Sequence, residues 1–287
     1  MENIKTIVIS GANSGIGKAT ALDLAKLGHR LVLICRSEQR GKAAVESLIH
    51  DSKNNAIELF LCDLSNQASI AACGQAIRAK YDAIDILINN AGAIFGQHQL
   101  NNNGLEQTFA LNHMGYFLLT HELLGLIKQG TGKRIVNVAS IAHKFTRKIP
   151  WGDLQLQHLK YKQMKAYSLS KLYNIYFTRV LAERLKSDNI TVNCFHPGTI
   201  YSGFGASGSD FFAKLVQVGG PLLSKPSLGA KTAVYLALSP KVATQSGQYF
   251  AHRRIAHSSR LSKNKQQAER LWDSSMSYAK LKEYGKV

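Results

Sequence analysis

A tyrosine and a lysine stand four residues apart in the segment Tyr167-Ser168-Leu169-Ser170-Lys171. Within a helix, this spacing places the phenol and the ammonium group on the same face. A free tyrosine has a pKa of about 10, which is too high for easy proton transfer at neutral pH, but a nearby cation favours the phenolate and lowers that pKa. The pair can therefore act as a general acid or base, with Tyr167 moving the proton and Lys171 supplying the charge. Because this pattern also occurs often by chance, its meaning depends on the residues around it.

Ser140 is the first of those residues. It ends an apolar run, Arg134–Ser140, which we expect to be a β-strand. Ligands of parallel sheets bind in the crevice outside the carboxyl ends of the strands, so Ser140 should face such a crevice. Its hydroxyl could donate to a substrate oxygen and stabilise charge that develops there. With Tyr167 and Lys171, it predicts proton exchange with a carbonyl or alcohol group.

A glycine-rich turn lies between the first expected strand, Ile4–Ser10, and the first expected helix, Gly15–Leu27. Glycines there allow a tight turn and a close approach of the backbone to a pyrophosphate, and the helix N-terminus offers free N–H groups to the phosphates. A lone glycine-rich turn is a weak signal, but this one has the required strand before it and helix after it. The residues that we expect to contact a dinucleotide are Gly11, Asn13, Ser14, Gly15, Ile16 and Gly17.

The end of the second expected strand, Arg30–Cys35, bears on the choice of dinucleotide. Enzymes that prefer NAD commonly carry a carboxylate there, which binds the ribose 2′-hydroxyl. Here Arg36 and Ser37 follow the strand instead. Arg36 could pair with a 2′-phosphate and Ser37 could add a hydroxyl donor, whereas an ordinary surface arginine is the alternative. We therefore expect NADP(H) as the cofactor, carrying the hydride.

Strand-like and helix-like segments alternate along the chain, which predicts a single α/β domain over residues 1–287 with a Rossmann-type, doubly wound parallel sheet of about seven strands and helices on both faces. One long helix is expected from Gly104 to about Lys128, and another over Gln163–Lys186. The connection at 141–162 should be a loop with short helical pieces, in which His143 and His158 are expected at the surface. A second irregular connection, about 199–227, is expected to be a substrate loop.

The spacing G-x-x-x-G-x-G, together with the Tyr-Lys pair, resembles the short-chain dehydrogenase/reductase family, and the match extends over nearly the whole chain. The segments Leu31–Ser37, Leu111–Thr120 and Ile135–His143 are most similar to the retinol-dehydrogenase-like branch. Two positions differ from the family pattern: Ser10 stands where a threonine is usual, and Ala139 stands where many relatives have a second serine. Many members of this branch have a membrane-anchoring N-terminal segment, and we expect none here.

The resemblance implies roles for further residues. It makes Asn112 the fourth catalytic residue, one that holds a water relaying protons to the lysine, and it places Asp63 at the adenine amino group. Without the other three catalytic residues, Asn112 would be interpreted as a polar residue on a helix face, and Asp63 alone could simply cap the next helix. The family's cofactor contacts also fall on these residues: Leu64, Asn90, Ala91, Gly92, Pro197, Gly198 and Thr199. A homodimer or homotetramer is likewise implied by the resemblance.

Composition sets wider limits. No apolar run is long enough to span a membrane and the N-terminus does not resemble a signal peptide, so we expect a soluble, cytoplasmic protein. The formal charge of +18 would suit phosphate-bearing ligands, anionic membranes or nucleic acid, but it is spread along the chain. No nucleic-acid-binding motif accompanies it, so nucleic acid is not expected as a partner, whereas peripheral membrane contact stays open. The four cysteines have no metal-ligand or redox spacing and are expected to be small buried side chains.

The expected substrate is an apolar small molecule that carries a carbonyl or an alcohol. The segments that should wall the pocket are rich in aromatic residues and poor in fixed charges, although those aromatics could equally be core or oligomer contacts. They are Phe95, Phe145, Trp151, Tyr161, Tyr201, Phe204, Phe211 and Phe212. Two alternatives stay open: a catalytically weak, cofactor-binding regulatory protein of the same fold, and a binder of membranes or nucleic acid that uses the basic surface.

Overall fold

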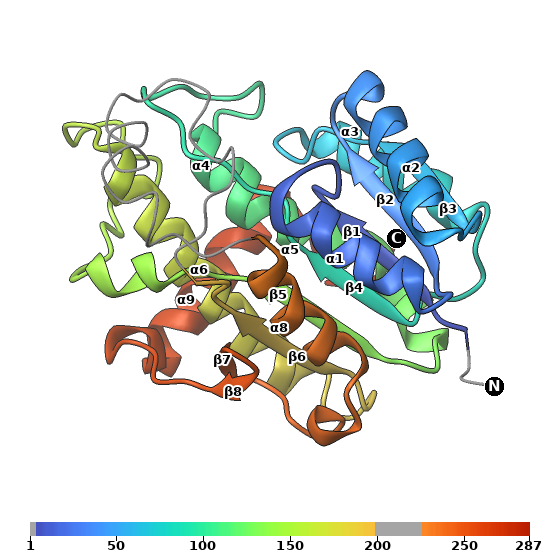
Figure 1. Cartoon of the computed structure of the whole chain (residues 1–287). Helices are drawn as coiled ribbons and strands as arrows, with labels where there is room; N and C mark the ends of the chain where they lie inside the picture. The colour runs from blue at the N-terminus through green and yellow to red at the C-terminus, as the bar shows by residue number, and fades with distance from the viewer. Residues whose placement is uncertain (1–3, 199–225) are drawn as a thin grey trace, which may run out of the picture.

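The computed structural model describes residues 4–198 and 226–287, and the described part forms a central twisted sheet with helices on both faces (Figure 1). The order of the strands across the sheet is β3-β2-β1-β4-β5-β6-β7-β8. The first three strands are added in one direction from β1 and the later strands in the other. The connection from β3 therefore crosses over to β4, which pairs with β1, and the strand order reverses between these two strands. The strands are β1 (Thr6–Ser10), β2 (Arg30–Cys35), β3 (Ile57–Leu61), β4 (Ile86–Asn89), β5 (Arg134–Val138), β6 (Thr191–Phe195), β7 (Tyr249–Ala251) and β8 (Arg254–Ile255).

All neighbouring strands from β3 to β7 are parallel, which confirms the predicted fold class. Among the strands of the described ranges, β8 alone is antiparallel; it returns from β7 through a tight turn and makes this sheet one strand larger than the expected seven. Along β1 the side chains alternate between the faces, so Ile7 and Ile9 join one buried cluster while Val8 joins the other. Such strands are apolar throughout because helices cover both faces.

The helices divide between those two faces. The cluster that contains Ile7 is covered by α1, α2 and α8, and the cluster that contains Val8 is covered by α3, α5, α6 and α9. The helices are α1 (Gly15–Lys26), α2 (Glu38–Ser52), α3 (Gln67–Arg78), α4 (Gln107–Phe109), α5 (Gly115–Gln129), α6 (Gln163–Arg184), α8 (Pro226–Leu238) and α9 (Lys265–Ala279). Across the described ranges, none of the helices combines the length and apolarity that a membrane crossing requires.

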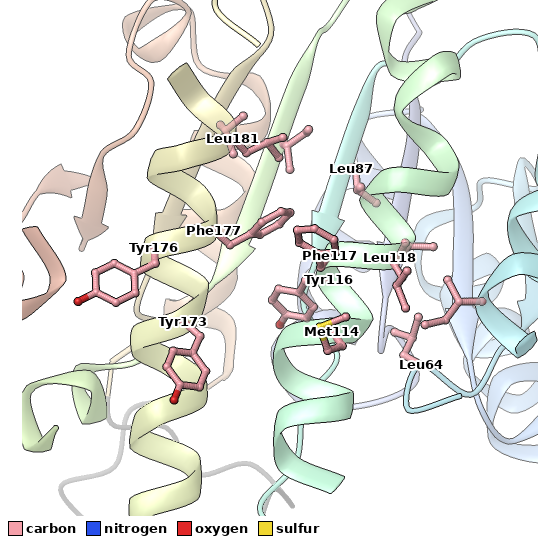
Figure 2. Close-up of a cluster of buried hydrophobic side chains, with 14 of the residues drawn as sticks. Leu64, Leu87, Met114, Tyr116, Phe117, Leu118, Tyr173, Tyr176, Phe177 and Leu181 are labelled. Atoms are coloured by element: carbon pink, nitrogen blue, oxygen red, sulfur yellow. The ribbon is translucent and has the colours of Figure 1, made fainter. Parts of the chain in front are cut away.

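Large aromatic side chains fill the space between α5 and α6. Phe117 from α5 and Phe177 from α6 point toward each other in Figure 2, and their ring centroids lie 5.6 Å apart. Trp272 of α9 continues the cluster, with its ring 5.1 Å from that of Phe117. Burial of such rings is the largest apolar contribution that single side chains make. It fixes α6, which carries Tyr167 and Lys171, against α5 and the sheet.

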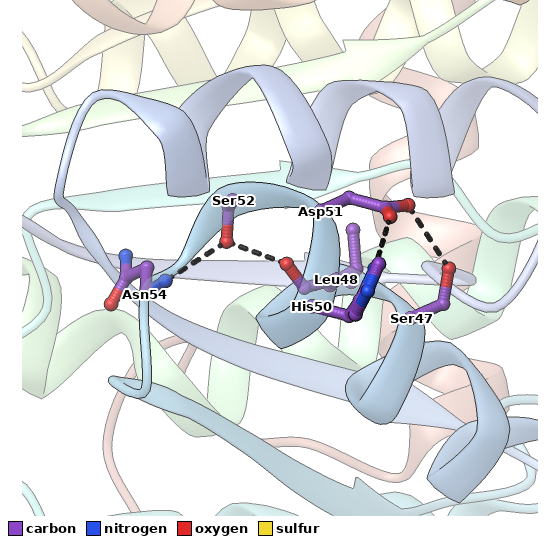
Figure 3. Close-up of polar contacts among 6 residues, drawn as sticks. All are labelled: Ser47, Leu48, His50, Asp51, Ser52 and Asn54. Carbon is purple, nitrogen blue, oxygen red and sulfur yellow. Dashed lines mark hydrogen bonds and ion pairs between the residues drawn. The ribbon is translucent and has the colours of Figure 1, made fainter.

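A polar network closes the end of α2 (Figure 3). Ser52 accepts a hydrogen bond from the backbone N–H of Asn54 at 3.2 Å, one of the contacts drawn there. The side-chain amide of Asn54 donates to the carbonyls of Ala25 at 3.0 Å and His29 at 2.8 Å. Since Ala25 belongs to α1 and His29 immediately precedes β2, Asn54 ties α2 to α1. This fixes the strand whose far end carries Arg36.

The observed structure differs in two ways from the long helix expected from Gly104 to about Lys128. Gly104 has a φ of +73° and lies in a turn, and the helix begins only after Glu106, whose carboxylate accepts from the N–H groups of Thr108 and Phe109. It is also not uniform, because residues Ala110–Met114 form a π-helical turn between α4 and α5. The rest of the expected helix, from Gly115 onward, is regular α-helix.

Candidate active site

Asn112 lies within the π-helical turn and is fully buried. Its side chain forms a reciprocal pair with the backbone of Ala93, accepting from its N–H at 2.9 Å and donating to its carbonyl at 2.9 Å. It also donates to Ser170 on α6 at 3.1 Å, and Ser170 in turn donates to the carbonyl of Tyr167. Asn112 therefore joins the segment after β4 to the helix that carries the tyrosine. The π-helical turn is consistent with this role, since such turns are frequent at functional sites.

Lys171 is buried, with 1 % of its surface exposed, and its Nζ donates to the carbonyl of Val138 at 3.1 Å. The same Nζ lies 5.6 Å from the ring centroid of Tyr167 and 5.7 Å from that of Tyr116. Burial disfavours the charged amine and lowers the pKa of Lys171 to about 7. Two aromatic faces and one carbonyl thus hold an amine that titrates near neutral pH.

Tyr167 lies one helical turn before Lys171 on the same face of α6, as the spacing predicts. Burial has the largest effect on this group and raises the pKa of Tyr167 to about 12, whereas a hydrogen bond between its hydroxyl and Ser140 acts in the opposite direction. The expectation from sequence was a lowered pKa, so for this tyrosine burial outweighs its neighbours. The phenol is therefore protonated at neutral pH, which is the form that donates a proton.

Ser140 does not end β5, as expected from sequence, but lies two residues beyond it. The strand stops at Val138, and Ser140 caps the short 3-10 helix Ile141–Phe145 by accepting from the N–H of Ala142 at 3.1 Å. This contact occupies one lone pair of the hydroxyl oxygen and leaves its hydrogen free to donate. Ser140, Tyr167, Lys171 and Asn112 are thus brought together at the carboxyl ends of the central strands.

The glycine-rich turn leaves the start of α1 open to a ligand. Ser14 is the N-cap of α1 but its side chain makes no capping hydrogen bond, and the first turn contains no acidic residue. Gly11 and Gly15 have φ angles of +68° and +54°, which favour glycine. A Cβ on Gly17 would lie 2.3 Å from the carbonyl oxygen of Gly11, so α1 can approach the turn only with glycine there. Backbone N–H groups at an uncapped helix start are the donors that a pyrophosphate needs.

The segment Asn90-Ala91-Gly92 packs against this turn. Ser10 accepts from the N–H groups of Asn90 and Ala91, at 3.0 and 3.1 Å, and the Asn90 side chain donates to the carbonyls of Ser10 and Gly11. The hydroxyl of Ser10 is therefore the group that this position requires, whether serine or threonine supplies it. A Cβ on Gly92 would lie 3.2 Å from Asn112 Oδ1 and 3.6 Å from Lys171 Nζ. The segment that packs against the glycine-rich turn therefore also contacts the catalytic residues, through Gly92.

Arg36 follows β2 directly and is exposed, and Ser37 caps α2 by accepting from the N–H of Arg40 at 3.4 Å. An exposed guanidinium beside a capped helix start can pair with a phosphate oxygen. No carboxylate follows the strand at positions 36 and 37. The residues at this strand end therefore fit a nucleotide that carries a 2′-phosphate.

Asp63 follows β3 and its carboxylate accepts from the N–H and the hydroxyl of Ser65, at 2.9 and 2.7 Å. It caps a turn, whereas Asn66 caps α3, so the alternative that Asp63 caps the helix is wrong. The carbonyl of its neighbour Leu64 would lie 2.7 Å from a Cβ on Gly115, which requires glycine at the start of α5. Both residues lie just beyond the carboxyl end of β3.

His196-Pro197-Gly198 follows β6 at the same edge of the sheet. The N–H of Gly198 donates to His196 Nδ1 at 3.1 Å and Gly198 has a φ of +94°, so the segment is a fixed turn. Thr199 and most of the expected substrate loop lie outside the described residues, as do Tyr201, Phe204, Phe211 and Phe212. Residues 226 and 227 of the expected loop belong to α8. Among the described residues, no cluster of His, Cys, Asp or Glu could hold a metal ion.

Comparison with known proteins identifies the family. Residues 5–151 match the family model described as short chain dehydrogenase. The chain belongs to the short-chain dehydrogenase family. Its relatives include mouse retinol dehydrogenase 12, 38% identical over 269 residues, which cover 94% of this chain and 84% of that one. Human retinol dehydrogenase 13 is 36% identical over 276 residues, covering 93% and 82% of the two chains. The predicted retinol-dehydrogenase-like branch is confirmed.

Solved structures agree on this short-chain dehydrogenase fold. A protein from Mycobacterium paratuberculosis has a TM-score of 0.78 at 28% identity, over 96% of this chain and 94% of that one. A variant of actinorhodin polyketide ketoreductase, solved with NADPH, has a TM-score of 0.69 at 26% identity, over 87% and 96% of the two chains.

Three residues in the connection between β5 and α6 can be compared with what was expected: two aromatics of the expected pocket walls, and one histidine. Phe145 is 71% exposed, and Tyr161 is tied by its hydroxyl to the carbonyl of Phe95 and the carboxylate of Glu106. His143 was expected at the surface but is fully buried. Its hydrogen bonds join segments more than a hundred residues apart, for which local sequence carries no signal.

Proposed function

We propose that this short-chain dehydrogenase interconverts an aldehyde or ketone with the corresponding alcohol, using NADP(H) and Tyr167 as the general acid and base. The observation that carries the proposal is the arrangement of Tyr167 and Ser140 in hydrogen-bond contact, with the Lys171 amine 5.6 Å from the tyrosine ring. When bound, the nicotinamide supplies or accepts the hydride.

In the direction of reduction, Tyr167 donates its phenolic proton to the carbonyl oxygen of the substrate. Ser140 donates a hydrogen bond to the same oxygen and stabilises the negative charge that develops there. Lys171, with a pKa near 7, can carry the positive charge that favours the phenolate left behind. In the reverse direction Tyr167 must first lose its proton, so its raised pKa implies that alcohol oxidation becomes faster as the pH rises.

The cofactor would lie across the carboxyl ends of β1, β2 and β4. The N–H groups at the start of α1 would bind the pyrophosphate, and the Asn90–Gly92 segment would support the adenosine half. Arg36 and Ser37 would bind the 2′-phosphate of NADP(H). A ketoreductase of the same fold was solved with NADPH, so this fold can accommodate the proposed cofactor.

The substrate we propose is an apolar carbonyl compound, for which retinal is a reasonable first candidate because the relatives' names specify retinol. The intact proton-transfer set argues against a purely regulatory protein, since a regulator needs none of these residues. Oxidation of NADPH should be followed at fixed enzyme concentration against a panel that includes retinal, linear aldehydes and cyclic ketones. If no member of the panel is turned over with either NADPH or NADH, the proposed activity is wrong.

Replacing Arg36 tests the cofactor preference separately. Arg36→Asp removes the partner of the 2′-phosphate and introduces a carboxylate that can bind a ribose 2′-hydroxyl. We expect kcat/KM with NADPH to fall by about 10- to 100-fold, the loss expected for one charge-assisted contact of about 1.4–3 kcal/mol, and kcat/KM with NADH to rise. A matched control is Arg40→Asp, since Arg40 is also exposed and lies in the first turn of α2, the helix that follows Arg36. Equal or better kcat/KM of the wild-type enzyme with NADH would contradict the preference.

A further inference from the structure

His143 is a buried histidine that has no place in the proton step described above. It is 0 % exposed and lies three residues after Ser140 in the 3-10 helix. Its ring Nδ1 lies 2.6 Å from the carbonyl oxygen of Ser140. On the other side of the ring, the backbone N–H of Ser259 donates to Nε2 at 3.0 Å. One imidazole thus joins the residue that contacts the Tyr167 hydroxyl to a segment 116 residues further along the chain.

These two contacts determine which nitrogen of the His143 ring carries a proton. A backbone N–H can only donate, so Nε2 must be the bare, accepting nitrogen. A carbonyl can only accept, so Nδ1 must carry the proton. Both contacts are satisfied only by the neutral tautomer protonated at Nδ1. Burial has the largest effect and lowers the pKa of His143. The hydrogen bond to the Ser140 carbonyl opposes this effect and the cations Lys144 and Arg179 add to it, and the net lowering of the pKa favours the uncharged ring.

The same ring begins a line of aromatic contacts across the active-site edge. Its centroid lies 5.0 Å from that of Tyr249 on β7, and Tyr249 stacks on His196 at 5.8 Å. His196 accepts from the N–H of Gly198 and so fixes the turn that follows β6. The three rings in this line are those of His143, Tyr249 and His196. At one end His143 bonds Ser140, beside the proton donor, and at the other end His196 bonds Gly198.

We propose that His143 is a positioning residue, which holds Ser140 in the orientation that the proton step requires by bonding its carbonyl and anchoring it to Ser259. The inference rests on the proposed function, because it assigns His143 its effect through Ser140. Two groups of Ser140 are held by hydrogen bonds. Its hydroxyl accepts from the backbone N–H of Ala142, and its carbonyl accepts from the imidazole of His143. The backbone N–H of His143 also donates to this carbonyl, at 3.3 Å. The imidazole contact, at 2.6 Å, is shorter and is the one that reaches across to Ser259, so its loss would let Ser140 shift relative to Tyr167 without changing any group that touches the substrate.

Two substitutions separate the hydrogen bond from the bulk of the ring. His143→Phe keeps an aromatic side chain against Tyr249 but removes both hydrogen bonds, whereas His143→Asn can place an amide donor where Nδ1–H now lies. We expect the phenylalanine variant to lower kcat by about 10- to 100-fold, since small misplacements of a positioned group cost rates of this order. Its KM for NADPH should stay within about threefold, because the phosphate turn is untouched. The asparagine variant should recover much of the lost kcat.

His158→Phe is the matched control, since His158 lies exposed on the same connection between β5 and α6. It should leave kcat and KM unchanged. A His143→Phe variant that folds and keeps kcat within about twofold of the wild type would overturn the proposal. So would a loss confined to the KM for NADPH, because that pattern indicates an effect on cofactor binding instead of Ser140.

A measurement on the unmodified protein covers the case in which the variant does not fold or no carbonyl substrate is turned over. The nitrogen-15 chemical shifts of the imidazole rings distinguish a bare from a protonated nitrogen. We expect His143 to show a protonated Nδ1 and a bare Nε2 at neutral pH. A ring protonated at Nε2, or a charged ring, would contradict the inferred contacts. Absence of turnover by the wild-type enzyme would instead refute the proposed function, so the two failures are distinguishable.

Discussion

Replacing Lys171 by methionine should stabilise the fold while it removes a charge that the proton step uses. The amine is almost fully buried, and it donates a hydrogen bond to the carbonyl of Val138 at 3.1 Å. Methionine is unbranched and of similar length, so it can fill the same space. Val138 keeps a partner in the variant, because the side chain of Asn174 donates to the same carbonyl at 3.2 Å. The substitution therefore removes a buried amine without leaving its acceptor unpaired.

The size of the effect follows from the pKa of the lysine. Burial lowers that pKa from 10.5 to about 7. Between these values the unfolded chain binds more protons than the folded one, so this residue makes stability rise with pH over that range. Below pH 7 the amine is charged in both states, and the folded state carries the full cost of burying the charge. At about 1.4 kcal/mol per pKa unit, this cost is on the order of 3–5 kcal/mol.

Urea unfolding followed by circular dichroism, at about pH 6 and about pH 9, measures the difference directly. We expect the free energy of unfolding of Lys171→Met to exceed that of the wild type at the lower pH, and the gap to shrink at the higher one. Lys186→Met serves as the control, since Lys186 is exposed just beyond α6 and its replacement should give no such trend. A variant less stable than the wild type at the lower pH, or a gap that does not change with pH, would refute the reasoning.

Two further predictions concern the frame of the site. Gly17→Ala should lower stability by about 1–3 kcal/mol and weaken NADPH binding, measured by urea unfolding and by cofactor fluorescence, because its Cβ would lie 2.3 Å from the carbonyl oxygen of Gly11. Gly125→Ala is the control, because Gly125 is exposed on α5 and nothing lies within 4 Å of the new Cβ. It should raise the free energy of unfolding by up to about 1 kcal/mol, since alanine favours a helix more than glycine does. Equal effects of the two substitutions would contradict this prediction. Asn137→Ala removes the acceptor of Asn89 and a donor to Thr178, and should cost about 1–3 kcal/mol in the free energy of unfolding, whereas an unchanged urea midpoint would count against it.

Much of the fold could be predicted because the sheet is buried on both faces. Strands such as Arg30–Cys35 are continuous apolar runs, and helices such as α2 begin at a capping residue, Ser37. All four cysteines are buried, as expected for small apolar side chains. The sequence could not reveal β8, because two residues are too few to show a strand pattern and their strand conformation depends on pairing with β7. Nor could it reveal the π-helical turn, since one inserted residue barely changes the apolar periodicity.

Some features of the candidate site could likewise be predicted from the sequence, and others could not. Tyr167, Lys171 and the glycine-rich turn could be predicted because their spacing along one helix or one turn already sets their geometry. The depressed pKa of Lys171 and the raised pKa of Tyr167 could not, because they depend on how deeply the packed fold buries each group. His143 was placed wrongly at the surface for a similar reason. Its partners, Ser140 and Ser259, come together only when the C-terminal segment packs against the end of β5.

The most direct test of the central claim is a single-turnover measurement of NADPH oxidation by the wild type and by Tyr167→Phe, on a carbonyl substrate that the wild type reduces. The substitution removes only the phenolic oxygen and its proton. We predict that the rate of the hydride-transfer step falls by about 100-fold or more, the usual contribution of a positioned general acid. NADPH binding, measured by its fluorescence, should stay within about threefold because the phosphate turn is intact. A variant that keeps the wild-type rate would show that another group donates the proton.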